Sequence, residues 1–232
     1  MNDGSRLPKV SSKVIAIAVA AILVIIAVGV VSCSGGGNKP VVEKKVTKAE
    51  ATKAKKKGLE LYRQGKWDGA MEELKKAAEG NPQDMHTQFQ LAYTYEQKGQ
   101  LDNAYKQYEQ ILKIDKSSAD AHYSMGRVLM QKKELSKAIE QFETAAKMDT
   151  DFTSVRADLA IAYAQAKDYK KALATYDELA KLIKSDALYV SRIHVAKGQI
   201  YEKMGEDGSA KAEFEKALKL DKNNKEAAEA LK

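Results

Sequence analysis

The feature that most constrains this chain is a pair of small residues that recurs with a period near 34 residues. Alanine is the second member of each pair, and a glycine or alanine lies twelve residues before it. The pairs are Gly58/Ala70, Ala92/Ala104, Gly126/Ala138, Ala160/Ala172 and Gly198/Ala210. The first four are spaced 34 residues apart and the last follows after 38. A period of this length predicts a stack of two-helix units, each of which needs its neighbours to bury its apolar face.

Each unit is predicted to fold as helix–turn–helix. With Ala51 counted as position 1, the units are 51–84, 85–118, 119–152, 153–186 and 191–224. Apolar positions within each half are separated by 3, 4 and 7 residues, which places them on one helix face. Gly65, Gly99 and Gly205 fall at position 15, where the chain has to turn between the two halves.

Bulky residues accompany the small ones in every unit. Position 11 is Leu61, Tyr95, Leu129, Tyr163 or Tyr201, and position 24 is Leu74, Tyr108, Phe142, Tyr176 or Phe214. We expect the small residues at positions 8 and 20 to let the two helices of a pair approach closely. The bulky residues can then interlock between them.

This pattern resembles the tetratricopeptide repeat family over about 174 of the 232 residues. The resemblance implies an all-α fold, a right-handed solenoid of about five helical hairpins with a concave groove lined by first helices. The chain departs from the family at position 4, where no Trp or Leu is found, and the family's closing proline is present only as Pro82.

The ends of the stack are expected to be atypical. Lys57 and Lys197 occupy position 7, which is apolar in the middle units. Four extra residues, 187–190, precede the last unit and correspond to about one helical turn, so we expect a longer second helix in the fourth unit. Residues 225–232 are predicted to begin a capping helix with Ala228 and Leu231 facing inward.

An apolar run at residues 14–31 predicts contact with a membrane. As a helix its 18 residues would span roughly 27 Å, close to the thickness of a bilayer's hydrocarbon core. Residues 1–32 are therefore either a signal peptide or an uncleaved transmembrane anchor. The sequence Val30-Val31-Ser32-Cys33 resembles a bacterial lipoprotein signal, which implies lipid attachment at Cys33, the only cysteine. That resemblance favours the cleaved form, with the repeats on the non-cytoplasmic side of a bacterial cell envelope.

The net charge of +7 comes from the amino-terminal part of the chain. Residues 33–50 are a Gly- and Lys-rich linker, and residues 39–57 carry eight Lys against two Glu. From residue 58 onward, 28 Lys/Arg face 29 Asp/Glu. This basic stretch is either a solvated linker, which we favour, or a segment lying on anionic lipid. The nearly neutral repeats do not indicate a nucleic-acid partner.

The sequence contains no recognisable catalytic, cofactor or metal motif. His86, His122 and His194 are far apart, and with one cysteine they offer no metal-ligand spacing. No Gly-rich phosphate loop or nucleophile–His arrangement is present. We therefore expect a non-enzymatic protein that needs no cofactor.

The family resemblance places positions 2, 5, 9, 12 and 13 of each first helix in the concave groove. Residues chosen on that basis are Leu59, Tyr62, Phe89, Tyr93, Tyr123, Val128 and Gln131. Large apolar groups outside a core mark binding surfaces, and an apolar partner segment would suit them. The alternative is that some of them pack between neighbouring first helices.

The expected function is that of a membrane-tethered scaffold or adaptor, which binds a protein or peptide partner through its groove. The architecture suggests a role in assembling an envelope or secretion complex, although no residue selects a pathway. Two alternatives remain open at this stage. One is a self-associating structural component, and the other is an anchored adaptor that faces the cytoplasm.

Overall fold

The computed structural model describes residues 45–232, and their secondary structure is helical throughout. The helices are α2 (Lys48–Arg63), α3 (Trp67–Gly80), α4 (Met85–Gln97), α5 (Leu101–Ile114), α6 (Ala119–Gln131), α7 (Leu135–Met148), α8 (Thr153–Gln165), α9 (Tyr169–Leu182), α10 (Ala187–Met204), α11 (Asp207–Leu220) and α12 (Lys225–Ala230).

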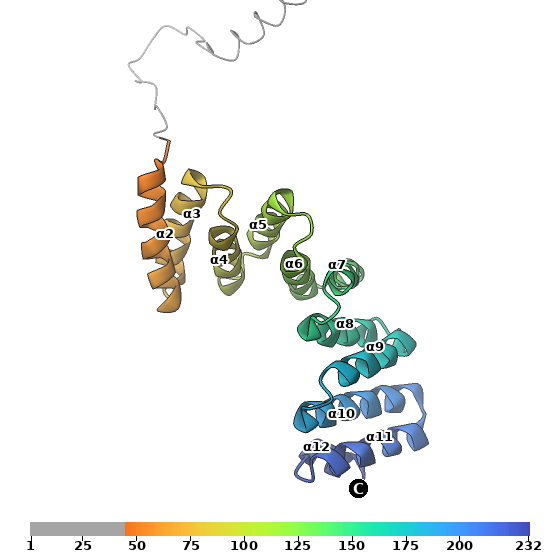
Figure 1. Cartoon of the computed structure of the whole chain (residues 1–232). Coiled ribbons are helices and arrows are strands. Elements are labelled where there is room, and N and C mark those ends of the chain that lie inside the picture. Colours follow the sequence, from red (N-terminus) through yellow and green to blue (C-terminus); the bar gives the residue numbers. More distant parts are fainter. Residues whose placement is uncertain (1–44) are drawn as a thin grey trace, which may run out of the picture. The chain divides into compact units, whose positions relative to one another are not determined.

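The helices form five consecutive antiparallel pairs, which pack one against the next. The pairs are α2/α3, α4/α5, α6/α7, α8/α9 and α10/α11, and α12 packs on α11. Figure 1 shows the first helices α4, α6, α8 and α10 along the inner side of the curved stack, with α5, α7, α9 and α11 along the outer side. The all-α repeat fold expected from the sequence is confirmed.

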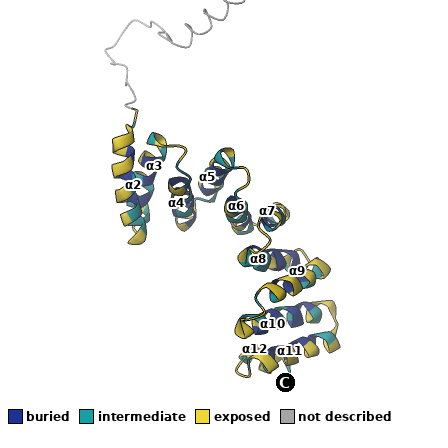
Figure 2. Cartoon of the chain, in the orientation of Figure 1, coloured by how far each residue is buried: buried dark blue, intermediate teal, exposed yellow. Residues whose placement is uncertain are grey.

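The small residues of the repeat lie where the two helices of a pair meet. The five alanines at position 20 are at most 3% exposed, and the buried residues run through the middle of every pair (Figure 2). A Cβ atom added to Gly126 would come within 2.5 Å of Phe142 Cε1, and one added to Gly198 within 2.6 Å of Phe214 Cε1. Position 8 is therefore small because the position 24 side chain of the same pair fills the space above it.

The residue at position 15 has a left-handed backbone conformation in every repeat. Gly65, Gly99 and Gly205 have φ values of 68°, 67° and 76°. Lys133 and Lys167 occupy the same turn with φ values of 61° and 62°. The turn geometry is thus set by the packing of each pair, and two units adopt it with a residue that has a Cβ atom and disfavours it.

Two sequence expectations about the carboxyl-terminal units are wrong. The extra turn lengthens the first helix of the last unit: α9 has 14 residues like its counterparts, whereas α10 has 18. The reason is the Asp186 side chain, which accepts a hydrogen bond from the Tyr189 backbone N–H and so starts α10 early. In the capping helix, Ala227 is buried and Ala228 is exposed, while Leu231 packs against the last pair as expected.

The lysines at position 7 of the end units are paired with carboxylates. Lys57 Nζ lies 2.7 Å from Glu73 Oε1 at position 23 of its own pair. Lys197 is only 8% exposed, and its Nζ lies 2.7 Å from Asp177 and 3.5 Å from Glu213, also at position 23. The buried charge of Lys197 is tolerated because these two carboxylates face it, whereas Lys57 is exposed to solvent.

Among residues 45–232, no helix combines the length and apolar character that crossing a bilayer requires. The membrane segment predicted at 1–32 and the lipid-attachment residue Cys33 lie outside the described residues, as does most of the predicted linker.

Replacing Gly126 with alanine is expected to lower the free energy of unfolding by about 1–3 kcal/mol, because Phe142 is fully buried and cannot yield space. Urea unfolding of residues 45–232, followed by circular dichroism, measures the change. Gly208→Ala is the control, since a Cβ atom there meets nothing within 4 Å. Equal stability of Gly126→Ala and the parent would contradict the packing argument.

Replacing Lys133 or Lys167 with glycine is expected to stabilise the protein by about 0.5–1 kcal/mol each, because the relief of left-handed strain outweighs the added entropy of the unfolded chain. The reciprocal change Gly99→Lys is expected to destabilise, although a Cβ atom there has open space. Thermal melting of the three variants tests this, and a lower melting temperature for both glycine variants would disprove it.

Candidate functional site

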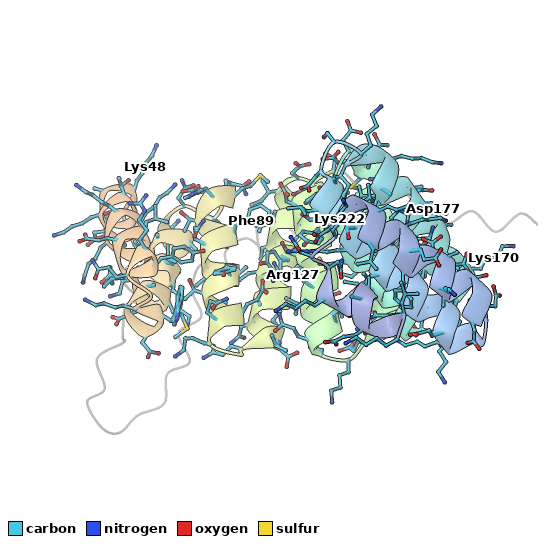
Figure 3. The ribbon with its side chains drawn as sticks, turned by 90° about the horizontal axis from the view of Figure 1, so that it is seen from below. Lys48, Phe89, Arg127, Lys170, Asp177 and Lys222 are labelled. Carbon is cyan, nitrogen blue, oxygen red and sulfur yellow. The ribbon has the colours of Figure 1, made fainter. Side chains whose placement is uncertain are left out.

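The candidate site is the inner surface of the stack, formed by the first helices. Capping fixes where these helices begin: Asp84 accepts a hydrogen bond from the Thr87 N–H, and Ser118 accepts one from the Ala121 N–H. Positions 5, 9 and 12 then project from one face, because they are separated by 3, 4 and 7 residues along each helix. Figure 3 labels Phe89 on α4 and Arg127 on α6, the next first helix along the stack.

Three aromatic side chains from the first two pairs meet at the amino-terminal end of this surface. The ring centroids of Tyr62 and Tyr93 are 5.7 Å apart, and Trp67 lies 5.5 Å from Tyr62 and 6.4 Å from Tyr93. All three side chains are half-buried. We call Tyr62, Trp67 and Tyr93 the aromatic patch. Rings in mutual edge contact keep their positions while still offering a face to a partner.

A second group of side chains surrounds Tyr123 on α6. Its ring lies 5.0 Å from that of Phe152 and 5.9 Å from that of Phe142, and the Arg127 guanidinium lies 5.9 Å from its centroid. Burial raises the pKa of Tyr123 to about 12, and the neighbouring Asp158 carboxylate contributes to the rise. We call Tyr123, Arg127 and Asp158 the central patch. It combines an aromatic ring with both signs of charge.

Phe89 is mainly a packing residue and contributes less than the two patches to the accessible inner surface. Its ring centroid lies 5.9 Å from that of Tyr108, and it packs against the core of the second pair. Tyr108 is buried and donates a hydrogen bond of 2.6 Å to Glu96 Oε1. Burial and the Glu96 carboxylate raise the pKa of Tyr108, so the phenol stays protonated as the donor. Phe89 therefore covers a buried Tyr–Glu hydrogen bond.

The structure brings most of the predicted groove residues to the inner surface, with one exception. Leu59, Tyr62, Phe89, Tyr93 and Tyr123 are half-buried, and Gln131 is exposed. Val128 is fully buried and cannot contact a ligand there. It stands at position 10, about 100° round the helix from position 9, and this position is also buried at Thr94, Ala162 and Ile200.

Two residues of the candidate site were missed by the sequence analysis, Arg127 and Trp67. Arg127 is the true position 9 residue of the third unit and is exposed, and strict counting of repeat positions would have found it. Ile161, which the family resemblance also places in the groove at position 9 of the fourth unit, is 41% exposed. Trp67 stands at a core position in the repeat pattern, and only its ring contacts place it in the aromatic patch.

Two of the three histidines, His122 and His194, are held by hydrogen bonds within their helix pairs. His122 Nδ1 lies 2.8 Å from Gln141 Oε1, and His194 Nδ1 lies 2.6 Å from Glu213 Oε2. Within residues 45–232, no group of three or more His, Cys, Asp or Glu side chains is placed to hold a metal ion. The chemistry that the inner surface offers is aromatic contact, hydrogen bonding and charge pairing.

Comparisons with known proteins agree with this architecture. Models of the tetratricopeptide repeat family match residues 61–128, 96–154 and 129–191, and a further model of the same repeat matches 191–224. No curated protein sequence matches the chain.

Solved structures with the same fold include a crystal structure of the MamA protein. It is 23% identical, with a TM-score of 0.69, over 76% of this chain and 94% of that one. MamA from Desulfovibrio magneticus RS-1, from residue 41 to its end, is 18% identical, with a TM-score of 0.67, over 75% and 97% of the two chains. YrrB, described as a TPR protein with an unusual peptide-binding site, is 17% identical, with a TM-score of 0.63, over 78% and 96%.

Tyr123 is expected to keep its proton up to a pH of about 12, two units above the usual tyrosine value of 10.0. Removing the carboxylate with Asp158→Asn should lower this pKa without restoring it to 10.0, because burial is the larger cause. A pH titration by NMR of ¹³C-labelled tyrosine measures both values, with Tyr123→Phe identifying the signal. An ordinary pKa for Tyr123 in the parent protein would contradict the described environment.

Proposed function

Because the chain belongs to the tetratricopeptide repeat family, we propose that it is a membrane-tethered scaffold that binds a partner protein through its inner surface. Protein interaction is the general role of this repeat fold. Beyond this general role, we propose a membrane tether, a binding site on the inner surface and a place in the cell envelope. The role is non-catalytic, since the inner surface offers contacts but no arrangement for chemistry.

The observation that carries the proposal is a row of half-buried aromatic residues, which lie on the first helices except for Trp67 at the start of α3. Tyr62, Trp67 and Tyr93 form one end of the row, and Tyr123 lies further along it. Rigid aromatic side chains that keep part of their surface open are the usual anchors of protein interfaces. Arg127 and Ile161 extend the row with a cation and an exposed apolar side chain.

The chemistry of this surface favours a partner segment with apolar side chains. An amphipathic helix or an extended strand presents such side chains at regular spacing, which suits a row of patches along successive helices. The Arg127 guanidinium and the Asp158 carboxylate of the central patch would fix the register of the bound segment through charge pairing. A peptide-binding site is described for YrrB, which has the same fold.

The apolar run at 14–31 supports the membrane tether, and the Val30-Val31-Ser32-Cys33 sequence supports lipid attachment. With Cys33 lipidated, the repeats would act on the non-cytoplasmic side of a bacterial envelope, in the assembly of an envelope or secretion complex. Residues 39–57 would then serve as a basic stalk between the lipid and the first repeat.

The inner-surface site is tested with two double variants of the full chain, used as baits for capture from solubilised host membranes. Tyr93→Ala with Tyr123→Ala removes one ring from each patch. Tyr105→Ala with Tyr169→Ala is the matched control, since these tyrosines are also half-buried but lie on the second helices. We expect the inner-surface variant to lose a partner that the parent and the control retain, with affinity lowered by about tenfold or more.

Circular dichroism of both variants establishes that they remain folded. Equal capture by the two double variants would refute the inner surface as the binding site. A concentration series by sedimentation of the parent chain detects self-association, the competing structural role.

The tether is tested by measuring the intact mass of the protein extracted from membranes. We expect a chain that begins at Cys33 and carries added acyl mass. A full-length mass would exclude lipidation and leave an uncleaved anchor, whose orientation protease accessibility of the repeats would then decide. A chain that lacks both residues 14–31 and any lipid would exclude the membrane tether altogether.

A further inference from the structure

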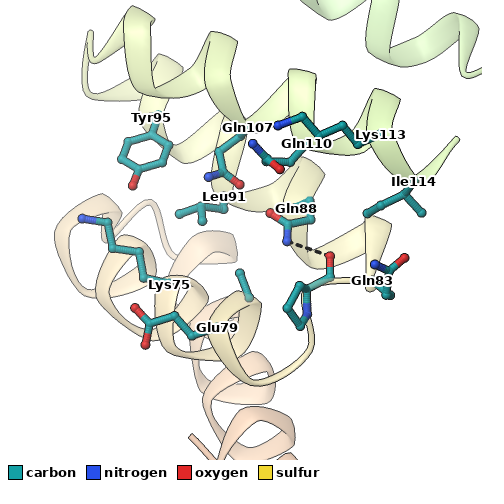
Figure 4. A pocket seen from close by; sticks show the side chains of 12 residues that line it. Lys75, Glu79, Gln83, Gln88, Leu91, Tyr95, Gln107, Gln110, Lys113 and Ile114 are labelled. Atoms are coloured by element: carbon teal, nitrogen blue, oxygen red, sulfur yellow. Dashed lines mark hydrogen bonds between the residues drawn. The ribbon is translucent and has the colours of Figure 1, made fainter. Parts of the chain in front are cut away.

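A groove on the outer side of the stack lies between α3 and α5, with α4 as its floor (Figure 4). Its volume is about 690 Å³. Leu91 and Tyr95 on α4 line its base, and Gln107 and Gln110 line the α5 wall. The inner-surface patches are built from other side chains. This groove therefore has no part in the function proposed above.

The groove contains a buried polar atom without a partner. Gln107 Oε1 is inaccessible to solvent and accepts no hydrogen bond. A buried carbonyl oxygen left in this state costs free energy, so it usually marks a missing ligand or an ordered water.

Comparison of the five described repeats shows why Gln107 is unpaired. Gln107 stands at position 23, where the other four residues all have partners within the protein. Glu73 binds Lys57, Gln141 binds His122, Thr175 donates to the Lys171 carbonyl, and Glu213 binds His194. In the third and fifth units the partner is the position 4 histidine.

In the second unit the position 4 residue points elsewhere. Gln88 Nε2 donates a hydrogen bond of 3.0 Å to the Pro82 carbonyl oxygen, as Figure 4 shows. Pro82 is the only proline at this place in the repeats. The Pro82 carbonyl, in the loop before α4, thus accepts the hydrogen bond that the Gln88 amide would otherwise donate to Gln107 Oε1. No side chain among the described residues fills the groove above Gln107.

The lining chemistry matches an extended polypeptide. Gln107 and Gln110 carry amides, and an amide offers both a donor and an acceptor, as does each peptide unit of an extended chain. Lys75 on α3 and Lys113 on α5 face the groove from opposite walls, against the single carboxylate of Glu79. The resulting positive charge favours a peptide with an acidic side chain.

We propose that this outer groove is a second binding site, which takes an extended peptide segment carrying an acidic side chain. The Gln107 side chain, whose Oε1 has no partner within the described residues, turns into the groove so that this oxygen accepts a backbone N–H of the peptide. Lys75 and Lys113 face the acidic side chain of the peptide, and the half-buried Ile114 contacts an apolar one. The scaffold would then hold two segments at once, one on each side of the stack.

The test uses a phage-displayed library of random linear decapeptides, selected on the full chain in detergent. The selected chain carries Tyr93→Ala and Tyr123→Ala, so that binding to the inner surface is suppressed. Labelled copies of the enriched decapeptides are then titrated by fluorescence anisotropy against three forms of the chain: the parent, Gln107→Leu and Gln141→Leu. Gln141→Leu is the matched control, because it alters position 23 of the next unit, where His122 occupies the amide.

We expect enriched decapeptides that contain Asp or Glu and that bind Gln107→Leu about tenfold more weakly than the parent. Gln141→Leu should bind them with unchanged affinity. Lys113→Glu should weaken binding as well, since it reverses one charge of the groove. The absence of any enriched decapeptide, or equal binding to the parent and Gln107→Leu, would overturn the proposal.

Thermal melting provides a readout that does not depend on a peptide. Gln107→Leu should leave the melting temperature unchanged or raise it, because it removes an unpaired buried group. Gln141→Leu should lower it, because His122 loses its partner. A marked fall for Gln107→Leu would mean that the amide supports the fold and would count against the proposal. A concentration-dependent dimer of the parent that Gln107→Leu dissolves would place a second copy of the chain in the groove instead.

Discussion

The structure depends on one contact that recurs in each helix pair, the packing of the position 24 side chain over the small residue at position 8. Where position 24 is phenylalanine, as in Phe142 and Phe214, position 8 is glycine, and an added methyl group would meet the ring at 2.5–2.6 Å. Where it is tyrosine, as in Tyr108 and Tyr176, position 8 is alanine. This contact fixes the distance between the two helices, and the close packing of every pair lets the next pair stack on it.

Repetition of that contact has a consequence for binding. Because each pair presents the same face to the next, equivalent positions of successive first helices fall in a row along the inner surface. Positions that face solvent in the row are free to vary, and they hold Leu59, Tyr93, Arg127, Ile161 and Gln199 at position 9. The fold therefore supplies a regular surface, while its specificity depends on the residues that differ between units.

Departures from the repeat are as informative as the repeat itself. Lys197 is a buried charge that two carboxylates compensate, Glu213 at position 23 and Asp177 in the preceding helix pair. Lys57, in contrast, is exposed and pairs with Glu73 at the surface. In the second unit the same position 23 holds Gln107, whose partner is diverted to the Pro82 carbonyl. Position 23 thus carries an ion-pairing carboxylate in the two end units, whereas in the second unit it lines a groove near the amino-terminal end of the stack.

The sequence by itself determined the helix–turn–helix unit, the number of units and the turn at position 15, because helical periodicity and small-residue spacing are local properties of the chain. It also determined that Tyr62, Tyr93 and Tyr123 would lie near one surface. Counting repeat positions separates Arg127 at position 9 from Val128 at position 10, and the Asp186 cap that starts α10 is a contact over three residues, so both are local properties as well. Only the tertiary structure decided that Trp67 joins Tyr62 and Tyr93, that Ala227 rather than Ala228 faces inward, and that Gln107 Oε1 lacks a partner. These outcomes depend on contacts between different helices, which no local pattern encodes.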